Sequence, residues 1–396
     1  MRELLKRDVA APVVSLIFFQ SLTIMAMNAF GNAPDEVSNS YGIPESFTGI
    51  FTAICYLSAL TFGLFVSAPL ERFGAVRCCQ VTLLIGALGM TLFTLATPWS
   101  FVISAVMVGF AHGPMNPAGS FLIMRQATPR WRPLLFSLKQ TSIPIGGTLA
   151  GFLVPTLLIF TSWQTAMLII AAAMTLAAFI TRPFRDQIPR RHNTNSAGQK
   201  ENTWEPIQIV FQKGPIRELS LAAFILIGCQ ACVVSFLVIY LIKEIKLELQ
   251  WAGFIFGLAH GTSIIARIYL GILADRVIKT KTILGLCGVT TGICFFLLAA
   301  FPAEGSFSLL CLLGIILGNA NLGWVGLYFG EVSKLAPDGK AAQVTAGSQI
   351  YAFGSFVLIP PIFTLFIEHA NSYATGFFIV GIAGLVAGIR FLSIKY

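Results

Sequence analysis

Long apolar runs follow one another along almost the whole chain, and they limit what it can fold into. A helix needs about 20 mostly apolar residues to cross a bilayer. Closed β-barrels also span membranes, but their strands alternate apolar and polar residues, and these runs do not alternate. The sequence therefore predicts an all-α integral membrane protein with twelve transmembrane helices. They are expected over 10–31, 45–68, 79–97, 100–124, 134–160, 163–181, 217–242, 250–273, 281–301, 306–330, 341–367 and 373–393.

The few charged residues are distributed in a way that predicts the topology. Only 11% of the chain is charged, and the net charge is +9. Cytoplasmic loops of membrane proteins collect Lys and Arg. With the N-terminus in the cytoplasm, every Lys and Arg lies on the cytoplasmic side except Lys139, Lys243, Lys246 and Arg267. We therefore predict that both termini are cytoplasmic and that the protein is a multi-pass protein of the cell membrane, specifically a bacterial inner membrane. The basic surplus then reflects topology and predicts no nucleic-acid partner.

One polar stretch divides the chain into two similar halves. Residues 182–216 have the composition of a linker. We predict that they form a cytoplasmic linker between an N-terminal six-helix bundle, 1–181, and a C-terminal six-helix bundle, 217–396. Gly109-Phe-Ala111 in the first half has a counterpart in Gly318-Asn-Ala320 of the second. Secondary transporters with duplicated halves hold their substrate between the halves, near the middle of the membrane.

Two acid–arginine loops occupy matching places in the two halves. Gly271-Ile-Leu-Ala-Asp275-Arg276 follows the eighth predicted helix, and Leu70-Glu71-Arg72-Phe73-Gly74 follows the second. In these loops and in its paired halves the chain resembles the major facilitator superfamily (MFS) over its full length. The resemblance implies a conformational latch on the cytoplasmic side, because a carboxylate there can bind an arginine and the positive end of a helix. Its residues are Glu71, Arg72, Gly74, Gly271, Asp275 and Arg276. The first loop departs from the family pattern at Ser67 and Pro69.

Two cations lie well inside the predicted membrane segments, whereas the acidic residues fall in loops or at the ends of the segments. A charge in the hydrocarbon region is costly, so each one is a candidate for function. Arg267-Ile-Tyr-Leu-Gly271 resembles a pattern of monocarboxylate and oxalate carriers, in which an arginine of helix eight binds the substrate carboxylate. A guanidinium suits that task because its planar fork matches a carboxylate in two hydrogen bonds. Alternatively, Arg267 braces Asp275 or faces the cytoplasmic opening.

Lys139 is the second intramembrane cation. It precedes Gln140 near the start of the fifth predicted helix, just before the segment Pro144-Ile-Gly-Gly147. A helix interrupted by such a segment can expose backbone dipoles to a cavity. The family resemblance places helices five and eight against each other, so we expect Lys139 and Arg267 to bind one anion together. Alternatively, the Lys139 side chain returns to the cytoplasmic interface.

Uncharged polar residues at membrane depth complete the predicted site. We predict that Gln140, Asn116 and Asn28 contribute to substrate binding beside the two cations. His112 titrates near neutrality and is the candidate for proton coupling. The alternative for His112 is a histidine that is hydrogen-bonded inside the bundle.

These features together predict a secondary active transporter that moves a small organic anion by alternating access. Its coupling ion is expected to be H⁺ or an exchanged anion. The alternative is an MFS efflux pump for drugs or other amphipathic compounds. A membrane enzyme would need clustered histidines and carboxylates at membrane depth, and the sequence offers none. We expect no cofactor and no metal, because Cys229 and Cys232 have no His or acidic neighbour. We expect a monomer embedded in the lipid bilayer.

Overall fold

The structure, a computed structural model, is all-helical in the part of the chain it describes. That part comprises residues 7–126, 128, 132–185, 205–212, 214–303, 305–337 and 340–394. Helices of the first half are α1 (Arg7–Met27), η1 (Phe30–Asn32), α2 (Pro34–Tyr41), η2 (Glu45–Phe47), α3 (Thr48–Leu64), α4 (Ser67–Phe73), α5 (Ala75–Phe93), α6 (Pro98–His112), α7 (Met115–Gln126), α8 (Arg132–Gln140), α9 (Ser142–Phe160), α10 (Trp163–Ile180) and η3 (Arg182–Phe184). Helices of the second half are α11 (Glu205–Phe211), α12 (Pro215–Lys243), α13 (Leu249–Arg276), α14 (Thr280–Ala299), α15 (Phe307–Leu317), η4 (Gly318–Leu322), α16 (Val325–Lys334), α17 (Ala341–Ala370) and α18 (Tyr373–Ser393).

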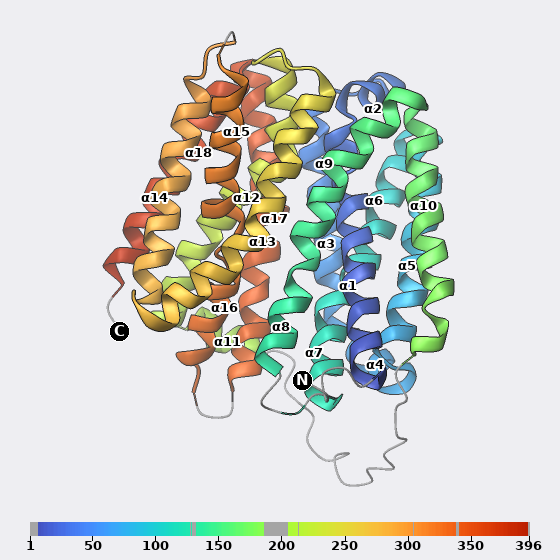
Figure 1. Ribbon diagram of the computed structural model, residues 1–396, viewed down its shortest axis with the longest axis vertical. Coiled ribbons are helices and arrows are strands. Elements are labelled where there is room, and N and C mark those ends of the chain that lie inside the picture. The colour runs from blue at the N-terminus through green and yellow to red at the C-terminus, as the bar shows by residue number, and fades with distance from the viewer. Residues whose placement is uncertain are drawn as a thin grey trace.

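The long helices stand side by side and the two halves of the chain lie next to each other (Figure 1). Helices of the first half, blue to green, occupy the right of the view, and helices of the second half, yellow-green to red, occupy the left. The upper end carries α2 and is called the α2 face here. The lower end carries α4 and α11 and is called the α4 face. The predicted bundle boundaries, 1–181 and 217–396, stay predictions.

Eleven helical segments are long and apolar enough to cross a membrane in the part of the chain that the structure describes. The predicted span 100–124 is the exception, because it is divided into α6 and α7 between His112 and Met115. Pro114 lacks the backbone N–H that would continue the helix, so neither piece reaches membrane length. The structure thus confirms a multi-span helical protein, and the number twelve stays a prediction.

A second interruption lies one turn earlier than the sequence predicts. The segment from Pro144 to Gly147 was expected to interrupt the fifth helix, but α8 ends at Gln140 and α9 begins at Ser142. Pro144 then stands in the first turn of α9, where a missing N–H is tolerated because no preceding turn requires it.

Close backbone contacts at two glycines repeat between the halves. A Cβ atom on Gly109 of α6 would lie 2.1 Å from the carbonyl oxygen of Cys55 on α3. A Cβ atom on Gly318 would lie 2.1 Å from the carbonyl oxygen of Ala259 on α13. Only glycine permits either approach. Gly109 and Gly318, which correspond to each other in the sequence, therefore permit the same kind of close helix contact in the two halves.

The predicted linker is described only near its ends. Residues 186–204 lie outside the described residues, while η3 and α11 flank them. The Nε of Arg185 donates a hydrogen bond of 2.8 Å to Oε1 of Gln80 on α5. Phe211 of α11 stacks on Tyr351 of α17 with ring centroids 4.9 Å apart. Helix α11 therefore packs against the second half at the α4 face.

Candidate functional site

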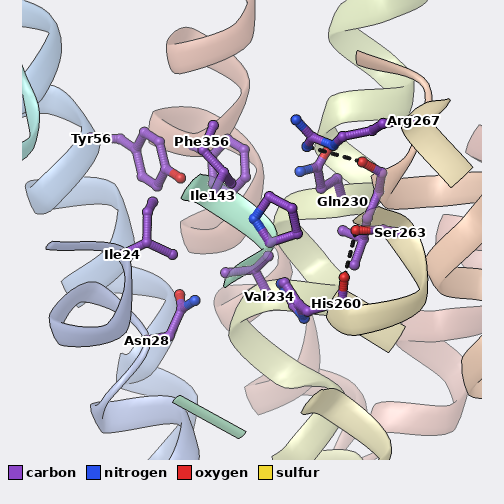
Figure 2. Close-up of a pocket in the computed structure, with 12 residues that line it drawn as sticks. Ile24, Asn28, Tyr56, Ile143, Gln230, Val234, His260, Ser263, Arg267 and Phe356 are labelled. Atoms are coloured by element: carbon purple, nitrogen blue, oxygen red, sulfur yellow. Dashed lines mark hydrogen bonds between the residues drawn. The ribbon is translucent and has the colours of Figure 1, made fainter. Parts of the chain in front are cut away.

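A small cavity lies between the two halves, and it draws its lining from both of them. Its lining residues are Ile24, Asn28, Tyr56, Ile143, Pro144, Gln230, Val234, His260, Ser263, Arg267, Leu322 and Phe356. Its volume is about 20 Å³, which is room for about one water molecule. Figure 2 shows Asn28, Ile24 and Tyr56 on one side and Arg267, Ser263 and His260 on the other. In this conformation the cavity is too small to hold an organic solute.

Arg267 of α13 is held across the two halves by backbone carbonyls. Its Nη1 donates to the carbonyl oxygen of Gln140 at 2.8 Å, and its Nη2 donates to the carbonyl oxygen of Leu322 at 3.2 Å. The Gln140 carbonyl is free for this contact because its helical donor would be the N–H of residue 144, which is Pro144. The interruption between α8 and α9 thus creates an acceptor that fixes Arg267 at the cavity.

No carboxylate neutralises Arg267 in the part of the chain that the structure describes. The lining contains no Asp or Glu, and Arg267 forms no ion pair with a described residue. Two buried polar atoms of the lining, Nε of Arg267 and Oε1 of Gln230, have no hydrogen-bond partner there. Because buried polar atoms are nearly always paired, these two are available to a ligand. Asp275 and Arg267 form no ion pair in this structure, so Asp275 does not brace Arg267 in this conformation.

His260 stands one turn from Ser263 on the same helix and borders the cavity. Its Nδ1 lies 3.0 Å from the carbonyl oxygen of Phe256, so that atom carries the proton when it donates and Nε2 is left as an acceptor. The ring lies directly on α9, since a Cβ on Gly147 would lie 2.0 Å from its Cδ2. The position of the imidazole therefore depends on glycine at 147.

Two aromatic rings join the halves beside the cavity. Tyr56 of α3 and Phe356 of α17 are stacked with centroids 4.0 Å apart and an angle of 17° between the rings. His112, the predicted proton-coupling residue, lies next to this pair, with its ring centroid 6.1 Å from that of Tyr56. Its Nδ1 is 3.3 Å from Oγ1 of Thr23. His112 is thus a buried, hydrogen-bonded neighbour of the site and is not part of its lining.

Lys139 and Asn116 lie inside the first half, away from the cavity lining. Lys139 is only 3% exposed, and its ammonium donates a hydrogen bond to Oδ1 of Asn116. The same oxygen accepts a 3.2 Å hydrogen bond from Nε2 of Gln20 on α1. The side chain neither returns to the membrane interface nor meets Arg267 in this conformation. Of the predicted binding residues, the structure therefore brings Arg267, Asn28 and the backbone of Gln140 together.

The predicted latch residues do not join the two halves in this structure. Glu71 and Arg72 on α4 are exposed, and so are Asp275 and Arg276 at the end of α13. Within the described residues neither acid forms an ion pair. Gly74, with φ of 88°, ends α4 and starts the turn into α5, a backbone geometry that favours glycine.

At the opposite face, contacts join the two halves around a surface cavity of about 500 Å³. Nζ of Lys243 on α12 lies 2.7 Å from Oδ1 of Asp35 and 2.9 Å from Oε1 of Glu45, both in the first half. Oγ of Ser46 donates to Oε1 of Glu368 on α17 at 2.7 Å. The two halves are therefore held together at the α2 face and are not linked through the latch loops at the α4 face.

Several lining residues escaped the sequence analysis. Gln230 was missed although it is the one side-chain amide in the long apolar run of α12, which is a signal that could have identified it. Tyr56 and Phe356 gave no such signal, because aromatic residues are frequent throughout the apolar runs. His260 and Ser263 were missed although their spacing to Arg267, seven and four residues on one helix, places them on the same helix face, which is a signal that could have identified them.

The fold and the interdomain cavity lead to a family. The chain belongs to the Major Facilitator Superfamily, whose family model matches residues 14–360. It is thus a multi-pass membrane transporter of small molecules, as the sequence predicts.

Solved structures show the same fold. A variant of the nucleoside transporter NupG has a TM-score of 0.78 and 14% identity, with 97% of this chain and 100% of that chain covered. A bacterial homologue of the human lysosomal transporter Spinster, in an inward-facing and occupied conformation, has a TM-score of 0.74 and 13% identity, with 96% of this chain and 95% of that chain covered. No curated protein matches the sequence.

Proposed function

We propose that this protein is a secondary active transporter of a small organic anion and that Arg267 binds the carboxylate of its substrate. The observation that carries the proposal is the uncompensated charge of Arg267 at the cavity between the halves. Neutral carbonyls hold two of its nitrogens, and its buried Nε has no partner among the described residues. A carboxylate offers charge-assisted hydrogen bonds, which are roughly twice as strong as neutral ones, so an anion can displace these carbonyls.

The lining supports a small polar anion. The amides of Asn28 and Gln230, the Ser263 hydroxyl and the free ring nitrogen of His260 surround the same space as Arg267. Such groups orient a ligand whose charge is met elsewhere in the cavity. The cavity of about 20 Å³ must widen before a solute enters, which the two halves achieve by moving relative to each other.

The topology of this proposal follows the charges. The α4 face carries the basic loops and is assigned to the cytoplasm, together with both termini, and α6 with α7 forms the twelfth span. The two six-helix bundles, 1–181 and 217–396, lie in the cell membrane, specifically a bacterial inner membrane. The transporter acts as a monomer.

Alternating access accounts for the contacts at the two faces. The closed α2 face and the unlinked loops at the α4 face correspond to an inward-facing conformation. In the outward-facing conformation Glu71, Arg72 and Gly74 would meet Gly271, Asp275 and Arg276 as a latch. Transport is driven by a coupling ion, either H⁺ or an exchanged anion.

Replacing Lys243 by glutamine should favour the outward-facing conformation. The two ion pairs of Lys243 join the halves at the α2 face, and its side chain is 37% exposed. Partly exposed pairs contribute roughly 0.2–1 kcal/mol each, so the loss of both should increase opening to the outside about two- to thirtyfold. The measurement is the labelling rate of a cysteine introduced at Ser263, with a membrane-impermeant maleimide in right-side-out vesicles.

A matched control uses the neighbouring lysine. Lys246 is exposed and forms no ion pair within the described residues, so Lys246→Gln should leave the labelling rate unchanged. Equal labelling rates for the Lys243 and Lys246 variants would show that these ion pairs do not hold the α2 face closed.

A second candidate function is efflux of amphipathic compounds. It is favoured by one observation, the stacked pair Tyr56–Phe356, which borders the cavity together with apolar residues of both halves. Planar, weakly polar compounds would insert between such rings. The similar fold of a nucleoside transporter makes a nucleoside a useful member of any screen for this alternative.

A ligand panel tests the proposal directly. The purified protein is screened by thermal unfolding against oxalate, lactate, succinate, glucuronate and taurine, and against uridine and ethidium as neutral and cationic probes. A ligand that binds the folded state stabilises it, by roughly 2.7 kcal/mol at a ligand concentration of 100 Kd. The unfolding temperature rises as a result. We expect stabilisation by at least one carboxylate, followed by its counterflow in proteoliposomes. Stabilisation by uridine or ethidium alone would contradict the anion proposal.

A further inference from the structure

Lys139 is a buried cation that the substrate site does not use. It is 3% exposed, and Asn116 Oδ1 is the acceptor of its ammonium within the described residues. An ammonium has three N–H donors, so two of them lack a protein acceptor there. A buried charge without a counter-ion is costly, and an ionisable group in that position can respond by losing its proton.

The surroundings of Lys139 are polar but uncharged. The Asn116 oxygen also accepts from Gln20, whose Oε1 accepts a 2.6 Å hydrogen bond from Oγ of Ser142. Titratable groups near Lys139 are His112 on α6 and Cys79 on α5, and the neighbours from α1 and α7 in this network are Gln20 and Asn116. The ammonium is therefore surrounded by amides and lacks a carboxylate that would keep it charged.

The two cations are joined through the interruption between α8 and α9. Lys139 and Gln140 are consecutive residues at the end of α8, with the Lys139 side chain directed into the first half and the Gln140 carbonyl bonded to Arg267. Oγ of Ser142 lies 2.6 Å from the carbonyl oxygen of Lys139 and 2.6 Å from Oε1 of Gln20, and its one proton is shared between these two acceptors, which fixes this turn. An anion that displaces the Gln140 carbonyl from Arg267 releases one side of the same turn.

Electrostatics determines whether anion binding at Arg267 favours or opposes protonation of Lys139. Two cations repel each other in a medium of low dielectric constant, and an anion at Arg267 offsets that repulsion. Anion binding therefore favours the ammonium form of Lys139, and by reciprocity protonation of Lys139 favours anion binding. The consequence is movement of the anion and a proton in the same direction.

We propose that Lys139 is the proton-carrying site of this transporter and that the protein is an anion–proton symporter. The inference rests on the proposed function, since it needs an anion at Arg267. On release, one N–H bond of the Lys139 ammonium breaks, the electron pair stays on Nζ, and the proton leaves to water on the side to which the site is open. His112, whose Nδ1 lies 3.3 Å from Oγ1 of Thr23, is the competing carrier that the test has to separate from Lys139.

The test compares proton-driven uptake with exchange in proteoliposomes. For each carboxylate of the panel, the first assay measures counterflow of the radiolabelled compound without a pH gradient. The second assay measures its uptake when the outside is made acidic, and the pH-sensitive dye pyranine inside the vesicles reports proton entry. In Lys139→Gln and Lys139→Met we expect gradient-driven uptake to fall roughly tenfold or more and counterflow to weaken as well, because both variants lack the positive charge that favours anion binding. The stem of Lys139 packs closely against Gly119, since a Cβ on that glycine would lie 2.8 Å from Cε of Lys139. Methionine is included because it fills the space of this stem.

Three further variants make the outcome specific. Lys139→Arg keeps a charge that proteins cannot deprotonate, so it should lose gradient-driven uptake as the glutamine variant does. Lys334→Gln removes an exposed lysine and should behave as the wild type. If His112→Gln loses gradient-driven uptake while Lys139→Gln keeps it, the proton site is His112 and the proposal is overturned. Absence of wild-type counterflow for every carboxylate would instead overturn the proposed function itself.

Discussion

Arg267→Ala is expected to reduce carboxylate counterflow to the background of empty liposomes. Truncating one partner of a buried, hydrogen-bonded charge contact costs roughly 2–5 kcal/mol, or about 30-fold and more in affinity. The alanine variant loses the one positive charge of the cavity lining. It also frees the carbonyls of Gln140 and Leu322, which then face the cavity as acceptors and disfavour an anion. The measurement is initial-rate counterflow together with the thermal shift on adding the same carboxylate.

Two other substitutions separate binding from folding. Arg267→Lys keeps the charge but loses the planar fork, so it should retain part of the thermal shift and bind more weakly than the wild type. Arg77→Ala removes an exposed arginine that lies over the Phe73 ring, 5.8 Å from its centroid, and should transport normally. If Arg267→Ala unfolds at the wild-type temperature and still transports a carboxylate, Arg267 is not the anion-binding group.

The sequence predicts the multi-span helical fold because length and hydropathy alone set the membrane-spanning segments. It places interruptions less well. Pro114 divides the predicted span 100–124, and this could be foreseen from the missing N–H. The gap between Gln140 and Ser142 is predicted one turn too late, because the missing N–H of Pro144 frees the carbonyl four residues earlier, at Gln140, and not the segment that follows the proline.

The substrate site is predicted only in part, for a geometric reason. Depth along a helix can be counted from the sequence, and that count identifies Arg267 and Asn28. The direction of a side chain around a helix that is apolar on all sides cannot be read in this way, because no polar stripe marks one face. The sequence therefore predicts Lys139 at the cavity, whereas in the structure its side chain bonds to Asn116 inside the first half.

Gly151→Ala is expected to prevent closure of the α2 face and to reduce uptake severely. Gly151 lies in the middle of α9, where that helix crosses the first half of α13. A Cβ at this position would lie 2.6 Å from the carbonyl oxygen of Gly253 and 2.6 Å from the backbone nitrogen of Gly257. Backbone atoms cannot rotate away as side chains do, so the helices must separate. Overpacking of this kind typically costs roughly 1–3 kcal/mol, which corresponds to up to about 100-fold.

The neighbouring glycine supplies a matched control at the same helix pair. A Cβ on Gly261 of α13 would lie 3.6 Å from Oγ1 of Thr148, an ordinary contact, so Gly261→Ala should transport within about twofold of the wild type. For Gly151→Ala we expect both lost uptake and faster labelling of a cysteine at Ser263 from outside. Lost uptake without faster labelling would indicate a folding defect, which thermal unfolding would detect.

The Gly151 contact also indicates how the two halves move relative to each other during transport. The Gly151 contact joins α9 of the first half to α13 of the second, and α13 carries Arg267 further along its length. If the halves rock as rigid bodies, separating α9 from α13 near the α2 face brings their other ends together. Exposed Asp275 at the end of α13 then approaches the loops of the first half, as the latch requires. A Gly151→Ala variant that labels faster from outside should therefore also bind oxalate or succinate from the outside without completing transport, which filter binding on right-side-out vesicles measures.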